Sequence, residues 1–159
     1  MAPRPLKASL TLAAAAAFSL SSAPAQAADP DPLVWTQLTA TYTATGPYGY
    51  EPSAPSGGYG RIDKCVPSMG YHYVNPNHIG SLDPGKPAAL LYEDGPHGRK
   101  LIGVEWVVAD TGQDAPKLFG QKFDEGQRAG LFTLHAWLYK ENPDGLFKGF
   151  NPTVQCPAP

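Results

Sequence analysis

Hydrophobic and polar positions alternate most clearly in two segments of this 159-residue chain, 99–109 (RKLIGVEWVVA) and 131–139 (LFTLHAWLY). Successive side chains of a β-strand point to opposite faces of a sheet. The even positions, 102–108 and 132–138, are apolar throughout, whereas the odd positions mix apolar with polar groups. Both segments are therefore predicted to be strands whose even positions face the core.

Two shorter runs, 70–74 (GYHYV) and 88–93 (AALLYE), are also predicted to be strands because turn residues bound them. The segment 33–42 (LVWTQLTATY) fits either a strand or a short helix, and 117–123 is ambiguous. No long segment has the 3.6-residue period of a helix. We predict an α+β, mainly β fold: a single antiparallel sheet or a small barrel, with one or two short helices.

The chain divides into three parts. Residues 1–27 have a short basic region, the apolar run 10–20 and a small-x-small motif at Ala25-Gln26-Ala27, the pattern of a secretory signal peptide. Residues 28–64 are predicted to be a flexible arm containing a Tyr/Gly/Pro-rich loop at 46–60. Residues 65–159 are predicted to form a sheet-rich globular domain. The protein is thus expected to be bacterial and secreted, either extracellular or periplasmic, without a membrane anchor.

Composition limits the classes of protein and partner. With 18 Pro and 17 Gly the chain comes near the level at which disorder is expected, but its 3 Trp, 8 Tyr and 6 Phe are typical of a packed core. There are 12 Lys and Arg against 14 Asp and Glu, without a basic cluster. Because phosphate binding needs a positive surface, nucleic acid is not an expected partner.

The chain has two cysteines, Cys65 and Cys156. In an exported protein such a pair predicts a disulfide bond, here one that closes most of the patterned part of the chain. The alternative is a thiol that serves as metal ligand or nucleophile.

Strand alternation also predicts a site on the second face of the sheet. Glu105 and His135 lie at the centres of the two odd-numbered faces. If the strands are neighbours, these side chains share a partly apolar face. His72 and Glu93 can join them from the shorter strands, and Trp137 and Tyr139 are predicted to line the resulting ligand pocket: His72, Glu93, Glu105, His135, Trp137 and Tyr139.

The first chemical hypothesis is a metal site formed by His72, Glu105 and His135, with Glu93 as a fourth or outer group. Two imidazoles and a carboxylate suit Zn²⁺ or non-haem Fe²⁺. No close ligand spacing such as HxxxH is present, and the alternative is that the histidines are hydrogen-bonded pocket or core residues.

The second hypothesis is metal-free catalysis, with Glu105 and His135 exchanging a proton; the alternative is a buried pair that orders the sheet. A third feature, Asp110-Thr111-Gly112 after an apolar run, is similar to the aspartic protease motif. Only one copy occurs, so that activity requires a homodimer, and the same tripeptide is ordinary turn chemistry.

A series of motifs resembles a group of small exported bacterial proteins of uncharacterised function. The resemblance covers about residues 65–156 and implies no catalytic residues. The motifs are 65–76 (CVPSMGYHYVNP), 89–93 (ALLYE), 103–108 (GVEWVV), 134–138 (LHAWL), 142–147 (NPDGLF) and 151–156 (NPTVQC).

From these features we expect a secreted pocket protein that binds a small-molecule ligand or a divalent metal, with room for a simple hydrolase or isomerase activity. The alternative is a non-enzymatic structural or interaction protein of the cell envelope that forms a homo-oligomer through its aromatic surface. Whether the protein is an enzyme is left open by the sequence.

Overall fold

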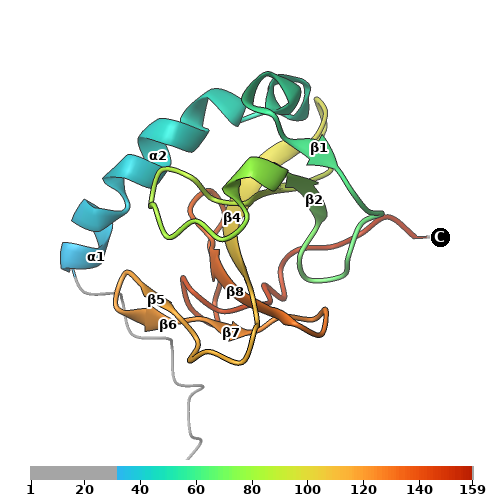
Figure 1. Ribbon diagram of the computed structural model, residues 1–159. Helices are drawn as coiled ribbons and strands as arrows, with labels where there is room; N and C mark the ends of the chain where they lie inside the picture. The colour runs from blue at the N-terminus through green and yellow to red at the C-terminus, as the bar shows by residue number, and fades with distance from the viewer. Residues whose placement is uncertain (1–31, 159) are drawn as a thin grey trace, which may run out of the picture.

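The computed structural model describes residues 32–158. Six strands form an open antiparallel sheet in the order β1-β2-β3-β4-β8-β7 (Figure 1). The fold class is confirmed as mainly β, and of the two predicted architectures the single sheet is the one found. The strands are β1 (Gly60–Arg61), β2 (Tyr71–Val74), β3 (Ala89–Glu93), β4 (Lys100–Ala109), β7 (Asp124–Glu125) and β8 (Leu131–Ala136). The predicted signal peptide lies outside the described residues.

The ambiguous segments resolve into a pair of short helices and a hairpin. Residues 33–42 fall in α1 (Pro32–Gln37) and α2 (Thr39–Thr45). Residues 117–123 contain β5 (Lys117–Leu118) and β6 (Gln121–Lys122), which pair with each other as a separate two-stranded sheet. The helices follow the outside of the main sheet (Figure 1).

The helices pack on the apolar face of the sheet and close the main core. Leu38, between the helices, is completely buried in the cluster that contains Trp106 of β4. The hydroxyl of Tyr42 donates a hydrogen bond to the carbonyl of Leu138 over 3.0 Å, and Thr41 donates one to Pro84 over 2.8 Å. Side-chain hydrogen bonds thus join α2 to loops at both ends of the strands.

The Tyr/Gly/Pro-rich tract at 46–60 is not the loop that its composition predicts. It forms two 3₁₀ helices, η1 (Gly46–Tyr48) and η2 (Glu51–Gly57), which turn back toward the sheet. Ala54 is fully buried, and the hydroxyl of Tyr92 donates to the carbonyl of Tyr48 over 2.6 Å. The prediction of a separate arm is corrected accordingly: residues 38–60 complete the core of the sheet. A third 3₁₀ helix, η3 (Pro76–His78), follows β2.

A β-bulge in β4 changes which side chains share a face. Leu91 pairs with Gly103 but the next residue of β3 pairs with Leu101, so Ile102 is the extra residue. Ile102 therefore leaves the main core and joins a small second cluster with Leu91 and Trp137, while Leu101 joins the main core. The predicted core position of Ile102 is wrong because simple alternation does not count the extra residue.

β8 is shorter than predicted, ending at Ala136 instead of continuing to Tyr139. Beyond Ala136 the chain bonds to other partners: the backbone N–H of Trp137 donates to Leu146, and its indole N–H donates to Lys148. The predicted faces still hold for Trp137, which joins the second cluster, and for Leu138, which joins the main core, whereas Tyr139 packs against the main core instead of the second face.

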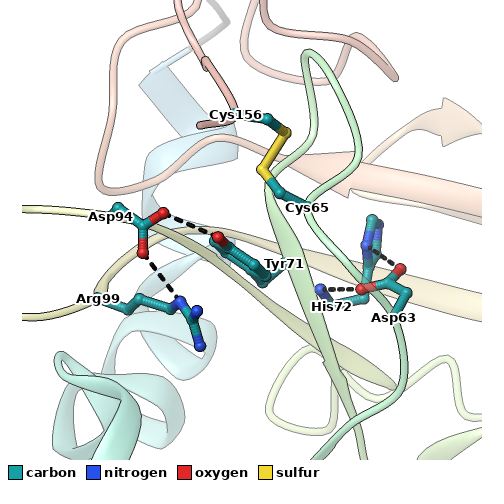
Figure 2. The surroundings of a disulfide bond; sticks show 7 residues. All are labelled: Asp63, Cys65, Tyr71, His72, Asp94, Arg99 and Cys156. Carbon is teal, nitrogen blue, oxygen red and sulfur yellow. Dashed lines mark hydrogen bonds and ion pairs between the residues drawn. A yellow bond between two sulfur atoms is a disulfide. The ribbon is translucent and has the colours of Figure 1, made fainter. Parts of the chain in front are cut away.

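The predicted disulfide is confirmed between Cys65 and Cys156, which are 91 residues apart in sequence. It fastens the C-terminal segment to the loop before β2 (Figure 2). Backbone hydrogen bonds reinforce this attachment, from Ser68 to Val154 over 3.3 Å and from Asn151 to Ser68 over 2.9 Å. The side chain of Asn151 is fully buried there.

We expect the double variant Cys65→Ala/Cys156→Ala to lose about 4–5 kcal/mol of unfolding free energy, because a cross-link over a long loop restricts the unfolded chain. Urea unfolding of the oxidised protein and the variant measures the difference. The reduced wild-type protein is the matched control and should unfold like the variant. Equal midpoints for the oxidised protein and the variant would contradict the prediction.

Candidate metal centre

Three strands bring His72, Glu105 and His135 together on the second face of the sheet. The register of β4 with β8 places Glu105 directly opposite His135, as alternation predicts for neighbouring strands. On its other side Glu105 pairs with Ala89 of β3, beyond which lies β2. β2 and β4 are separated by about 9.5 Å. The small side chain of Ala89 lets His72 and Glu105 approach each other over β3.

The donor atoms of the three side chains converge. Nε2 of His135 lies 3.6 Å from Oε1 of Glu105, and Nε2 of His72 lies 4.0 Å from Oε2 of the same carboxylate. All three donor atoms lie within 4.8 Å of one another, and all three residues are buried. The carboxylate thus stands between two imidazoles, close to each of them but beyond ordinary hydrogen-bonding distance.

Asp63, in the turn between β1 and β2, fixes the orientation of His72 (Figure 2). One carboxylate oxygen lies 2.9 Å from Nδ1 of the ring, and the other accepts the backbone N–H of His72 over 3.1 Å. A proton on Nδ1 that is held toward Asp63 leaves the lone pair of Nε2 facing Glu105. Metal-binding histidines commonly have such a carboxylate on the second nitrogen.

The electrostatics favour an ionised Asp63 and an uncharged His135. Burial raises the pKa of Asp63, but the hydrogen bonds from the ring and the backbone of His72 outweigh this effect and bring the pKa below its ordinary value. Burial lowers the pKa of His135, an effect that the charge of Glu105 opposes only in part. A neutral imidazole is the form that binds metal ions.

The aromatic ring of Trp137 packs against the ring of His135. Trp137 stacks on it with ring centroids 6.2 Å apart and an interplanar angle of 14°. Nε2 of His135 is fully buried and makes no hydrogen bond with any group in residues 32–158. A buried polar atom usually has a partner, so this nitrogen points to a group that the protein does not itself provide.

The three side chains lie at the wall of a pocket of about 450 Å³. Its other walls come from the loop before β2, from β7 and the turn after it, and from the C-terminal segment. Residues from these segments include Asp63, Met69, Asp124, Arg128 and Phe150. This volume falls in the range of pockets that bind small molecules.

Other residues predicted for the site lie elsewhere. Trp137 supports His135 but does not line the pocket, and Tyr139 leaves the second face to bond Thr45 of α2 over 2.7 Å. Glu93 is not in the pocket either: its carboxylate pairs with Lys140 at 2.6 Å and Lys100 at 3.2 Å. Ala89, not Glu93, is the partner of Glu105, and Glu93 lies four residues farther along β3, which is about 13 Å of strand.

The Asp110-Thr111-Gly112 motif forms an exposed turn. The carboxylate of Asp110 accepts the backbone N–H of Gly112 over 2.9 Å, and the hydroxyl of Thr111 bonds the side chain of Gln113. None of these residues lines the pocket. This arrangement agrees with the other interpretation of the tripeptide, that of an ordinary turn.

Asp63 is the site residue that sequence reasoning missed. The only local signal for it is the pairing of β1 with β2, which continues through the backbone hydrogen bond from Ile62 to His72 and brings Asp63 beside the ring. β1 has two residues and follows a Gly/Pro-rich tract, so no alternation marks it in the sequence.

The chain matches no family model, and comparisons with curated proteins and with solved structures give no match. The resemblance to small exported bacterial proteins stays a prediction. Within residues 32–158, no helix combines the length and the apolar character needed to cross a membrane.

Burial of His135 makes the stability of the metal-free protein pH-dependent. The unfolded chain takes up a proton on this residue near an ordinary pKa of about 6.5, whereas the folded protein resists protonation. The stabilisation is present above that pH and falls as the pH drops through it, by at most about 1.4 kcal/mol per pH unit. Urea unfolding between about pH 7.5 and 5.5 should show a shallower decline for His135→Gln than for the wild type.

The matched control is His97→Gln, because His97 is exposed in the turn after β3. This variant should keep the wild-type slope. Asp63 acts in a different range, since its lowered pKa stabilises the fold above about pH 3.9 and that contribution is lost only at lower pH. Identical slopes for the wild type and His135→Gln would contradict the assignment.

Proposed function

We propose that this protein is a secreted pocket protein that binds a divalent metal ion through His72, Glu105 and His135. The observation that carries the proposal is the convergence of three buried donor atoms from three strands within 4.8 Å. Ligands that each lie about 2.0–2.2 Å from Zn²⁺ are at most about 4.4 Å apart. The distances of 3.6 Å and 4.0 Å from the two oxygens of Glu105 to the two imidazoles are below that limit, and the 4.8 Å within which all three donor atoms lie is slightly above it.

A bound cation would also provide a partner for the polar atoms that face one another at this site. The carboxylate of Asp63 lies 2.9 Å from Nδ1 of His72. With the ring proton on Nδ1, the lone pair of Nε2 faces the carboxylate of Glu105. Nε2 of His135 faces the same carboxylate without a hydrogen bond. Acceptors that face one another in a buried place repel, and a divalent ion between them would convert that repulsion into coordination.

The donor set suggests the type of ion and its chemistry. Two imidazoles and one carboxylate suit Zn²⁺ or Fe²⁺ and leave positions free for water or a ligand. An ion of this kind activates bound water or polarises a carbonyl group, which would support a simple hydrolase or isomerase reaction. The disulfide is consistent with an oxidising compartment, as the proposed secretion requires.

Two alternatives remain as hypotheses with distinct outcomes. Proton exchange between Glu105 and His135 without a metal predicts activity that resists chelators. Assembly into a cell-envelope oligomer predicts a defined multiple of the monomer mass by light scattering, unaffected by substitution of His135.

We expect wild-type protein to bind one Zn²⁺ per chain, and His135→Ala to weaken binding by more than about 100-fold because it removes a ligand. Isothermal titration calorimetry on chelator-treated protein, with elemental analysis of the untreated exported protein, measures both. His97→Ala is the control, since His97 is exposed and lies outside the pocket. Equal Zn²⁺ affinity in the wild type and His135→Ala would overturn the proposal.

Asp63→Asn should weaken Zn²⁺ binding by about 10–100-fold while His72 is retained, because a neutral amide orients and polarises the ring less than a carboxylate does. The matched control is Asp124→Asn, which neutralises an exposed carboxylate that lines the same pocket. If both variants lose the same Zn²⁺ affinity, Asp63 acts only through its negative charge. The proposed role of Asp63 in positioning the ring of His72 is then wrong.

A further inference from the structure

Two chemically different groups of residues line the pocket. One is the donor set of His72, Glu105 and His135; the other consists of apolar side chains that are exposed to solvent. Three of the lining residues are both large and apolar and remain about half exposed: Ile62 at 53 %, Ile79 at 48 % and Phe150 at 52 %. Exposed apolar groups that gather around one pocket are a common mark of a binding surface.

Other residues that line the pocket are also apolar. Val66 and Met69 come from the loop before β2, Val74 and Val107 from the strands, and Leu131 from the start of β8. A ligand that fills the pocket and reaches the donor atoms therefore contacts hydrocarbon surface. Burial of such surface favours a ligand with an apolar body.

The charges around the pocket indicate what kind of head group the ligand has. A divalent ion bound by Glu105 and two neutral imidazoles keeps one net positive charge, and the carboxylate of Asp63 lies on the other nitrogen of His72, 2.9 Å from Nδ1. Arg128 is the one Lys or Arg among the residues that line the pocket, and its charge acts on Asp63, which places it near the donor set. Two acidic residues, Asp124 and Glu125, also line the pocket; they are exposed, as Arg128 is, and the charge of Asp124 also acts on His135.

Resting on the proposed metal site, we infer that the ligand is a small amphiphilic carboxylate. Its carboxylate oxygens occupy open positions of the metal ion beside Arg128, and its hydrocarbon body lies along the apolar walls toward Ile79 and Phe150. The anionic oxygen completes the coordination and neutralises the remaining charge, while the body covers the exposed apolar rim.

The test uses calorimetric titration of the Zn²⁺-loaded and the metal-free protein with acetate, butanoate, hexanoate and octanoate. Each added methylene should tighten binding to the loaded protein about two- to fourfold until the chain fills the pocket. Octanamide is the control for the head group and should bind the loaded protein at least about tenfold more weakly than octanoate, because it lacks the charge. Metal-free protein should bind octanoate much more weakly than loaded protein does.

Exposed positions allow variants that spare the core. Phe150→Ser should weaken octanoate binding several-fold and leave acetate and Zn²⁺ affinity unchanged. Arg128→Gln should weaken acetate and octanoate alike. Leu82→Ser is the matched control, because Leu82 has a similar exposure of 44 % but does not line the pocket.

The outcomes separate this inference from the proposal on which it rests. If Zn²⁺ fails to bind, the proposed function itself is wrong, and the inference falls with it. If Zn²⁺ binds but octanoate binds no better than octanamide or acetate, the metal site stands and the inference is overturned. Equal binding of octanoate to loaded and metal-free protein also overturns it, because the carboxylate then does not reach the metal.

Discussion

The antiparallel register of β4 between β3 and β8 decides which side chains can meet in this protein. It sets Glu105 opposite His135 and beside Ala89, so that a carboxylate reaches an imidazole on either side. A slip by one residue would exchange the two faces of the sheet, burying the carboxylate in the core. Trp106 and its neighbours on the opposite face make such a slip costly because their burial holds the register.

The candidate metal centre and the disulfide depend on the same peripheral segments. Asp63, which orients His72, lies two residues before Cys65. The C-terminal segment that Cys156 anchors supplies the carbonyl of Lys148 that holds Trp137, and Trp137 in turn stacks on His135. The covalent link therefore restrains both imidazoles through different neighbours.

Sequence reasoning was reliable where a strand is regular and unreliable where regularity ends. Glu105 and His135 lie within continuous alternation, and the structure pairs them as neighbouring strands require. Tyr139 follows the end of β8, and although its backbone N–H still bonds Ile102 of β4, its side chain packs against the main core and bonds Thr45. Glu93 lies four residues along β3 from Ala89, the partner of Glu105, and alternation predicts a face but not the register between strands. The extra residue Ile102 likewise cannot be read from alternation that looks unbroken.

The sequence by itself determined the mainly β class, the apolar faces of β8 and of β4 except at the bulge, and the pairing of Cys65 with Cys156, because these follow from alternation and from residue type. Tertiary structure decided the rest. It folded the Gly/Pro-rich tract at 46–60 into the core and placed Asp63 on His72. These contacts join segments without a periodic pattern, and their energy comes from burial and hydrogen bonds that exist only once the sheet has formed.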